Sequence, residues 1–447
     1  MVSAMGKPQR GGFKTVAEIR DPIHGYIMIT ELERRIVDTI IFQRLHYIRQ
    51  LAGAHYVYPG ADHSRFSHSL GVMHLAGITG EHLANLGYID QDEIQLLRIA
   101  GLLHDIGHGP FSHVYEELLV TYTGKTHEDM TQWLILNTEI KDILSEAGYD
   151  PKKVAELAVG KLKETDKPFL NQVISSPFDV DKMDFLVRDS YFTGVEYGYI
   201  DTYRLIYSTN VVDGELAIKV PAALHALEAF IIARYEMFKA VYFHRTVRSS
   251  ELLILKSMEG ARDELGLLAI NDPEDYIKLT DSWVMAKLKE LSMRSDIKDR
   301  EVKMAVDFYK MLERRDLLKC AYETVLHIQA PIMSNIMMQR SIRSKIEEEI
   351  ASRSGVEPDY IILDIPSVPS IPYTPRQMEP FEIPVYEIAD DGTPRRRRLT
   401  DISSLINVLR GYVDVLRVYT ISKYRSQVSK AAKEVLGEPS SLLSVSL

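Results

Sequence analysis

Nine of the fourteen histidines lie between His46 and His113, in a stretch whose apolar residues recur at helical spacing. Steps of three and four residues between apolar positions are typical of amphipathic helices. The spacing predicts helices over 66–86 and 92–104, the second ending near the glycines at positions 107 and 109. We therefore expect a mainly α-helical body that gathers imidazole side chains.

Periodicity and turn signals predict the other elements of this body. Further helices are expected over 126–136, 152–163, 169–175 and 222–258. An extended or turn segment is expected over 19–28, and Asp213-Gly214 between two apolar runs predicts a hairpin over 210–220.

The composition changes after about Gly355, where a smaller mixed α+β region is expected. Seven prolines lie from Pro358 to Pro384, and proline confines strands to edges or loops. Apolar residues at helical spacing over 402–416 predict a last amphipathic helix. The basic run Arg395–Arg398 is interpreted as a solvated turn in preference to a polyanion site.

Charge and cysteine content limit the partners. The chain has 53 basic and 63 acidic residues, a net charge of −10, so we expect neither general nucleic-acid binding nor membrane-surface binding. A polyanionic substrate would need a local cationic site or a metal. The single cysteine, Cys320, forms no intrachain disulfide, and no run of 18 apolar residues is present. The simplest expectation is a cytoplasmic protein.

Histidine and aspartate occur together in three separate segments. His68 follows Arg65-Phe66-Ser67, His104-Asp105 opens a second segment, and Asp181 lies in a third. Two imidazoles and two carboxylates suit Zn, Mn, Fe or Ni type ions, with positions left open for water. If the second helix runs one more turn, His108 lies on the same face as His104.

These motifs resemble the HD superfamily, whose defining pattern is matched by His68, His104-Asp105 and Asp181. The string Gly60–Gly71 resembles the deoxynucleoside triphosphate triphosphohydrolases, a group that includes bacterial dGTPases and the vertebrate SAM- and HD-domain restriction factor. The resemblance runs from about Asp21 to Arg248, roughly half of the chain.

The resemblance implies a role for each matching residue. The divalent metal, whether Mn, Mg, Fe, Zn or Ni, would be held by His68, His104, Asp105 and Asp181. His113 would protonate the leaving 5′ oxygen, and the other catalytic positions would be His108, His127 and Glu116, the last standing where the family commonly has aspartate. Substrate contacts would come from Gln50, Leu51, Arg65, Lys182, Phe185, Asp189, Arg234 and Tyr242, where Phe185 replaces a frequent tyrosine.

The implied reaction releases a deoxynucleoside and tripolyphosphate from a deoxynucleoside triphosphate. A triphosphate carries about four negative charges, which the metal and the cationic side chains would oppose. A metal can lower the pKa of bound water to about 7, and histidine suits protonation of a poor leaving group near neutral pH. Close packing of Leu51 and Tyr242 would exclude a 2′ hydroxyl.

A regulatory site is a further implication. Asp38 and Gln43 match positions that read a guanine base in regulated relatives, whereas His46 stands in place of an arginine and Arg20 in place of an asparagine. These residues could bind GTP or dGTP as an activator, or they could be ordinary exposed polar side chains on a helix, and the sequence favours neither interpretation. Such relatives are homotetramers, so a tetramer or dimer is expected.

The domains expected from these features are an N-terminal extended segment over 1–30, a helical HD catalytic core over 31–260, a helical extension over 261–350 and a mixed α+β region over 351–447. Two other functions stay open. One is an HD phosphohydrolase acting on a ribonucleotide, a monophosphate, or a cyclic or alarmone nucleotide. The other is a nucleotide-sensing or nucleic-acid-binding protein with a vestigial site, although all four ligands are present.

Overall fold

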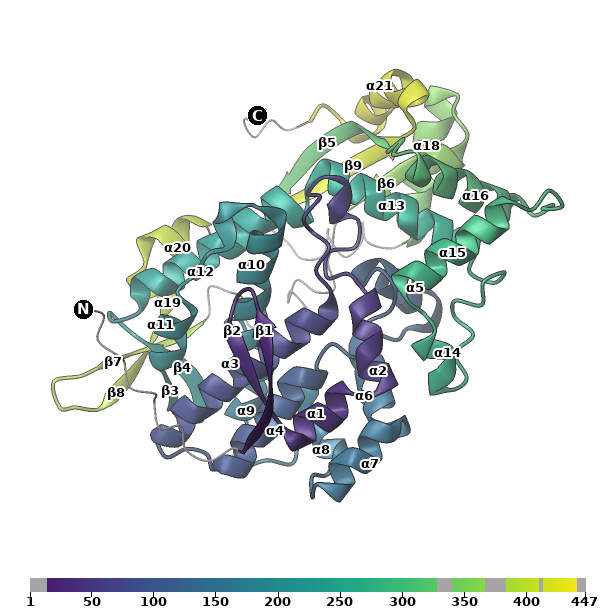
Figure 1. Ribbon diagram of the computed structural model, residues 1–447. Helices are drawn as coiled ribbons and strands as arrows, with labels where there is room; N and C mark the ends of the chain where they lie inside the picture. The colour runs from purple at the N-terminus through teal and green to yellow at the C-terminus, as the bar shows by residue number, and fades with distance from the viewer. Residues whose placement is uncertain (1–13, 328–339, 366–382, 410–412, 440–447) are drawn as a thin grey trace, which may run out of the picture.

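The computed structural model describes residues 14–327, 340–365, 383–409 and 413–439. The first 13 residues of the predicted N-terminal segment and the proline-rich stretch 366–382 lie outside them. The predicted mainly α fold is confirmed, with small sheets at the periphery (Figure 1). Within the described residues no helix has both the length and the apolar character needed to cross a membrane.

The chain starts with a hairpin, β1 (Thr15–Asp21) and β2 (Gly25–Thr30), paired antiparallel. The following helices form the body in which the histidines lie: α1 (Glu31–Val37), α2 (Ile40–Gln43), α3 (Arg65–Asn85), α4 (Gln91–Leu103), α5 (His113–Thr123), α6 (His127–Asn137), α7 (Glu139–Glu146), α8 (Pro151–Ala158), α9 (Phe169–Ile174) and α10 (Val180–Thr193).

The central pair of this body is α3 and α4, which pack against each other along most of their length (Figure 1). Helix α4 begins at a capping box, in which Asp90 accepts from the Glu93 amide and Glu93 accepts from the Asp90 amide. Close approach depends on Gly101, where a Cβ would lie 3.1 Å from the Val72 carbonyl oxygen. The pair therefore brings residues of α3 next to the end of α4.

The second half of the body differs from the sequence prediction in one helix. The hairpin over 210–220 is confirmed as β3 (Thr209–Val212) and β4 (Glu215–Lys219). The single helix predicted over 222–258 is wrong: α12 (Leu224–Met237) passes into a π-helical turn over Phe238–Tyr242, and α13 (Arg245–Gly260) starts at a His244 cap. The break turns Tyr242 away from the register of α12. The body is completed by α11 (Thr202–Tyr207), α14 (Pro273–Ile277), α15 (Asp281–Ser292) and α16 (Arg300–Glu313).

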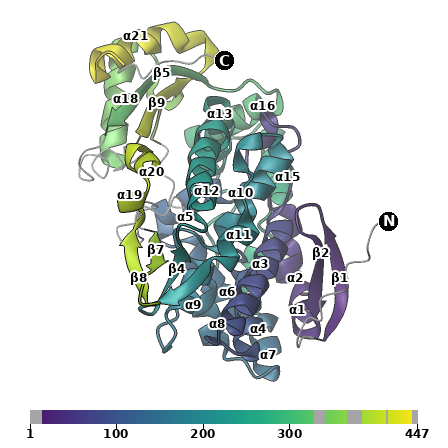
Figure 2. The ribbon, with the colours of Figure 1, turned by 90° about the vertical axis from the view of Figure 1, so that its left-hand side faces the viewer.

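A smaller unit at the other end is α+β, as expected. Its three-stranded sheet has the order β5-β9-β6, all antiparallel, and α18 and α21 lie over the sheet (Figure 2). The elements are β5 (Lys319–His327), α18 (Arg340–Ser354), β6 (Ile362–Asp364), β9 (Val413–Thr420) and α21 (Arg425–Leu436). Strand β5 falls in the span predicted as a helical extension, and the domain limits stay a prediction.

Two predictions near the C-terminal end are wrong. The amphipathic helix over 402–416 is instead α19 (Leu399–Ile402), α20 (Ser404–Leu409) and the first part of β9, because pairing of β9 with two strands overrides its helical spacing. Arg395–Arg398 is no turn but lies in β8 (Pro394–Arg398), which pairs with β7 (Pro384–Ile388) at a sheet edge. Its arginines are exposed, so the expected solvation holds.

Candidate active site

Three elements bring the four proposed metal ligands together. His68 lies in the first turns of α3, His104 and Asp105 directly follow α4, and Asp181 lies in the first turn of α10. Nε2 of His68 is 3.0 Å from Asp181 Oδ1 and 3.6 Å from Asp105 Oδ2. Nε2 of His104 is 3.4 Å from Asp105 Oδ1 and 3.7 Å from Asp181 Oδ1. The segments chosen from the sequence therefore converge on one point.

The donor atoms at this point fit a divalent metal. Nε2 of His68 and Nε2 of His104 are buried and make no hydrogen bond within the described part of the chain. Donor atoms of His68, His104 and Asp105 all lie within 4.8 Å of one another. Buried imidazole nitrogens that face carboxylate oxygens satisfy their lone pairs on a cation. This cluster can therefore hold a metal ion, and the roles of the four residues stay a prediction.

Each imidazole is fixed by its other nitrogen. Nδ1 of His104 lies 2.8 Å from the Gly101 carbonyl oxygen, which can only accept, so Nδ1 carries the proton and Nε2 is free to ligate. Nδ1 of His68 lies 2.7 Å from Asp184 Oδ2. Burial lowers the pKa of His68, but the carboxylates of Asp181 and Asp184 outweigh it and raise that pKa to about 10. The surroundings of His68 thus favour a positive charge, which a metal supplies.

Asp184 belongs to a buried network that the sequence analysis did not find. Arg188 donates to Asp184 Oδ2 from Nε over 2.8 Å and to Asp21 from Nη1 over 2.8 Å. His24 Nε2 lies 2.6 Å from Asp184 Oδ1. Both Asp21 and His24 belong to the β1–β2 hairpin, and a Cβ at Gly71 would overlap the Asp184 carboxylate. The hairpin therefore supports His68, a proposed metal ligand, through one carboxylate.

Two of the three proposed catalytic histidines share one carboxylate. Glu116 Oε2 lies 3.0 Å from His113 Nδ1, and Glu116 Oε1 lies 2.5 Å from His127 Nδ1. The rings of His108 and His127 are stacked, with centroids 4.1 Å apart. His108 Nε2 is 3.3 Å from Asp105 Oδ1. The glutamate that replaces the more common aspartate therefore reaches both histidines.

Charge differs among these histidines. Burial lowers the pKa of His127, but the Glu116 carboxylate raises it more, to about 9. Burial lowers the pKa of His113 despite the Glu116 hydrogen bond. Burial and the nearby Arg65 hold the pKa of His108 well below its usual value. His127 is thus a cation at neutral pH, whereas His108 is neutral.

The helix of His104 does not run the extra turn that would place His108 on the same face. Helix α4 ends at Leu103, and His108 is reached through a turn. A Cβ at Gly107 would overlap the His127 carbonyl oxygen, and one at Gly109 would overlap the Tyr115 ring. These glycines let the turn pass close to α5 and α6, so His108 faces Asp105 from the turn.

Two of the three proposed phosphate-binding cations, Arg65 and Lys182, have carboxylate partners. Arg65 forms an ion pair with Asp105 and donates from Nε to Ser112 Oγ over 2.6 Å. Lys182 donates from Nζ to Asp179 Oδ2 over 2.6 Å. Both line a cavity of about 660 Å³ that includes Asp105 and Asp181. Arg234 is buried beside the Phe238 ring and is absent from the cavity lining formed by the described residues.

The proposed sugar-binding residues form another wall of this cavity. Tyr242 donates its hydroxyl proton to Asp189 Oδ2 over 2.7 Å, and Asp189 Oδ1 lies 2.7 Å from His63 Nε2. Burial raises the pKa of Tyr242 well above its usual value, and the Asp189 carboxylate adds to this. The amide oxygen of Gln50 is buried with no partner in the described residues. The cavity lining on this side is Gln50, Leu51, Phe185, Asp189 and Tyr242.

The sequence analysis missed several cavity residues. Phe238, Phe243 and Val247 extend its apolar surface, and their only sequence signal was apolar character. His63, which contacts the cavity residue Asp189, lies within the string Gly60–Gly71 but received no role.

The proposed regulatory residues lie away from the cavity. Asp38 is exposed at the end of α1, with Arg34 at 3.7 Å. Gln43 donates to the Val37 carbonyl oxygen over 2.9 Å, and the exposed His46 stacks on Phe66. Arg20 lies over the Tyr26 ring. Each has a local contact, so a regulatory site stays a prediction.

Comparisons with known proteins place this chain in a family. Residues 65–181 match the model of the HD domain, and residues 200–442 match that of the HD associated region. Deoxynucleoside triphosphate triphosphohydrolase SAMHD1 of Homo sapiens is 32% identical over 384 residues, 76% of this chain and 59% of that protein. The chain thus spans about three fifths of that relative's length.

Two other relatives cover the chain more evenly. An uncharacterised protein of Methanocaldococcus jannaschii is 30% identical over 411 residues, 91% of this chain and 78% of that protein. The solved structure of a phosphohydrolase from Bacteroides thetaiotaomicron has a TM-score of 0.70 at 26% identity and covers 91% of this chain and 99% of its own. With the HD associated region matching more than half of the residues, the chain belongs to the HD-domain phosphohydrolase family and is homologous to deoxynucleoside triphosphate triphosphohydrolases.

Proposed function

We propose that this protein hydrolyses deoxynucleoside triphosphates to deoxynucleosides and tripolyphosphate, using a divalent metal. The observation that carries the proposal is that one cavity is lined by Asp105 and Asp181 of the His-Asp cluster, by the two histidines that share Glu116, and by the hydrogen-bonded pair Tyr242 and Asp189. A human relative over 76% of the chain bears this activity in its name. The four ligands His68, His104, Asp105 and Asp181 would hold the metal.

The metal, when bound, would supply Lewis acidity and a bound water of lowered pKa. His113 Nδ1 is held by Glu116, so Nε2 faces Arg65 and the cavity and can deliver a proton to the leaving 5′ oxygen. The cationic His127 and the guanidinium of Arg65 would oppose the charge that develops on the phosphate oxygens. His113 has a lowered pKa, and the triphosphate charge would raise it toward neutral pH.

Discrimination against ribose would come from the Tyr242 wall. The Tyr242 hydroxyl is already committed to Asp189, and Leu51 and Phe185 are apolar. A 2′ hydroxyl placed against this surface would lose its water without gaining a partner, which costs about 1–3 kcal/mol. The buried Gln50 oxygen could accept a hydrogen bond from the sugar.

The test is product analysis with the purified protein. Each deoxynucleoside and ribonucleoside triphosphate is incubated with manganese or magnesium, and the products are separated by chromatography. We expect deoxynucleoside and tripolyphosphate, and no product from the double variant His104→Ala, Asp105→Ala. Release of diphosphate, a monophosphate or a ribonucleoside would instead assign the protein to another HD phosphohydrolase reaction. Nucleotide binding without turnover would favour a sensor.

Regulation and assembly extend the proposal. Activation by GTP or dGTP at Asp38, Gln43 and His46, in a tetramer or dimer, is expected from the resemblance of these positions. Adding GTP to the same reactions and measuring mass in solution with and without it checks both. Turnover that is independent of GTP in a monomer would contradict both.

A further inference from the structure

The turn that carries His113 has an unusual backbone. Phe111 and Ser112 have φ values of 58° and 54°, and Ser112 has a ψ of −114°. Residues with a Cβ rarely adopt such conformations, which persist only when the surroundings hold them. Ser112 immediately precedes α5, whose first residue is His113. The direction of the His113 side chain therefore depends on what holds this turn.

A remote carboxylate holds it. Asp281, at the start of α15, is 3% exposed. Its Oδ1 accepts from the Phe111 amide over 2.6 Å, and its Oδ2 accepts from the Arg49 amide over 3.0 Å. Ser112 Oγ donates to the Arg49 carbonyl oxygen over 2.8 Å, closing the arrangement. One side chain thus joins the segment of His113 to the segment that precedes Gln50.

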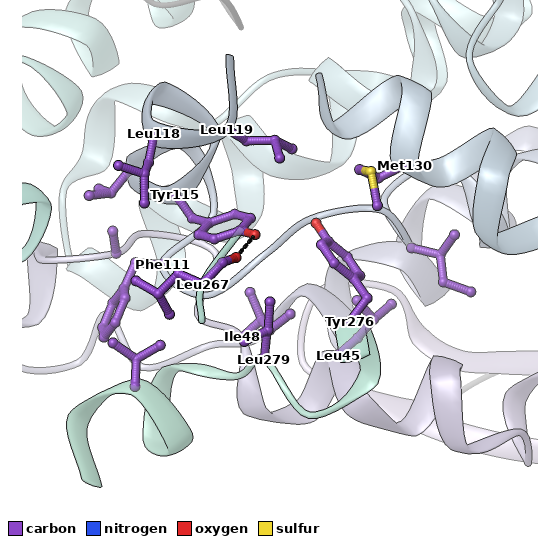
Figure 3. Close-up of a cluster of buried hydrophobic side chains, with 14 of the residues drawn as sticks. Leu45, Ile48, Phe111, Tyr115, Leu118, Leu119, Met130, Leu267, Tyr276 and Leu279 are labelled. Carbon is purple, nitrogen blue, oxygen red and sulfur yellow. Dashed lines mark hydrogen bonds between the residues drawn. The ribbon is translucent and has the colours of Figure 1, made fainter. Parts of the chain in front are cut away.

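The stretch before Asp281 is built onto the same turn. The Tyr276 hydroxyl donates to the Gly107 carbonyl oxygen over 2.7 Å. Arg44 donates to the His108 carbonyl oxygen over 2.8 Å and to the Leu279 carbonyl oxygen over 3.1 Å. Figure 3 shows the side chains of Phe111, Leu267, Tyr276 and Leu279 gathered in one cluster beneath the turn. Asp281 is thereby held rigidly against the Phe111 amide.

We propose that Asp281 is a positioning residue: by accepting both backbone N–H groups it fixes the Phe111–Ser112 turn and so aims His113 at the leaving group. This rests on the role proposed above for His113. Only a carboxylate offers two acceptor oxygens in this geometry, because the amide of asparagine would turn an N–H toward a backbone N–H. Burial raises the pKa of Asp281 to about 6, so at neutral pH the carboxylate is ionised.

The experiment compares Asp281→Asn with a matched control. Glu33 is also fully buried, accepts from the Thr30 amide over 2.9 Å and from Arg98 over 2.6 Å, and lies outside the site. Wild type, Asp281→Asn and Glu33→Gln are assayed on a deoxynucleoside triphosphate and on bis(4-nitrophenyl) phosphate, whose leaving group needs no proton. Metal content and melting temperature are measured in parallel.

For Asp281→Asn we expect kcat on the triphosphate to fall about a hundredfold with little change in KM, since a small misplacement of a reacting group costs that much. On the nitrophenyl ester the fall should be less than about threefold, because proton delivery is not needed. Metal content should stay that of wild type. Glu33→Gln should lower the melting temperature and leave the ratio of the two activities unchanged.

Three outcomes would overturn the inference: unchanged kcat, equal losses on both substrates, or losses that follow metal content. If wild type releases no tripolyphosphate, the proposed function fails by itself. The 4-nitrophenyl and methyl esters of thymidine 5′-phosphate then provide the good and the poor leaving group. Equal losses of Asp281→Asn on these two esters would overturn the inference.

Discussion

Two buried carboxylates, Asp184 and Glu116, each hold two histidines, yet their surroundings differ. Asp184 contacts His24 and His68 and also receives two hydrogen bonds from Arg188. Glu116 contacts two histidines as well, but within the described residues it pairs with no arginine or lysine.

The presence of an arginine beside Asp184, but not beside Glu116 among the described residues, gives the two carboxylate–histidine pairings different properties. The Arg188 guanidinium balances part of the charge of Asp184, and Asp184 together with Asp181 still favours a positive charge at His68, which a metal bound at Nε2 would supply. Among the described residues the charge of Glu116 is balanced by its histidines, so it stabilises a protonated imidazole. In the proposed site, one carboxylate would thus orient a metal ligand, and the other would hold a proton next to the cavity.

The largest expected effect is loss of the metal centre served by Asp184. In Asp181→Ala the cluster loses a carboxylate that faces both His68 and His104. Because a metal supplies several kcal/mol of transition-state stabilisation, we expect turnover to fall at least about a thousandfold. Elemental analysis of the purified variant should show metal far below one ion per chain. Wild-type metal content with wild-type turnover would contradict the assignment.

Removing the proton donor on the Glu116 side should come next. In His113→Asn we expect kcat to fall by about 10²- to 10³-fold, the usual contribution of a general acid. Metal content should not change, because His113 lies outside the ligand cluster. Turnover and metal content measured on the same sample distinguish this variant from Asp181→Ala. Loss of metal from His113→Asn would contradict the proposal that the Glu116 side acts separately from the metal site.

Weakening the outer support of the metal should have a smaller effect. In Asp184→Asn the hydrogen bond that fixes the His68 ring and the ion pair with Arg188 are both weakened. Metal affinity is expected to fall about 10- to 100-fold, as measured by titration of the apoprotein. Glu116→Gln is the matched control, since Glu116 touches no proposed ligand, and its metal affinity should equal that of wild type. A similar loss in both would contradict the comparison.

Glu116→Gln should instead change the pH dependence. The Glu116 carboxylate raises the pKa of His127, and its hydrogen bond raises that of His113 against the effect of burial. Without it both pKa values fall, so a protonated donor is lost at lower pH. The alkaline limb of kcat/KM should therefore move to lower pH. An unmoved limb would show that neither histidine acts as the acid.

The pH dependence of protein stability should also depend on the pairing of Glu116 with His127. A folded-state pKa of about 9 for His127, against 6.5 unfolded, means stabilisation that is full below about pH 6.5 and lost as the pH rises through 9. Glu116 has a lowered pKa, so its share is lost in acid. The difference in melting temperature between wild type and Glu116→Gln should thus be largest near pH 6 and small above pH 9. A difference that is constant with pH would contradict the charge pairing.

The sequence allowed the short-range parts of this molecule to be predicted. Helices with clear spacing, such as α3 and α4, and the Asp213-Gly214 hairpin were found within a few residues. The segments of His68, His104 and Asp181 were found because each carries a recognisable motif. Local spacing failed where pairing between distant segments decides the structure, as in β9, whose apolar residues also fit a helix.

The supporting contacts could not be predicted for the same reason. Asp184 lies three residues after Asp181 and so on a neighbouring face of α10, which is the one local signal in the sequence for its place beside the cluster. The partners His24 and Asp281 lie about 160 and 170 residues from the atoms they contact, and nothing in their local sequence marks them. The π-helical turn over Phe238–Tyr242 was also not predicted from the helical spacing of the segment.

The proposed metal ligands come from segments far apart in the chain, with Asp181 about 110 residues after His68. An unfolded chain therefore offers the ion no assembled site, and the ion becomes a thermodynamic partner in folding. At a free concentration one hundred times the dissociation constant, it would stabilise the native state by about 2.7 kcal/mol. The melting temperature of the protein would thus depend on the free metal concentration as well as on the sequence. Chelating buffers would lower it, and added metal would raise it.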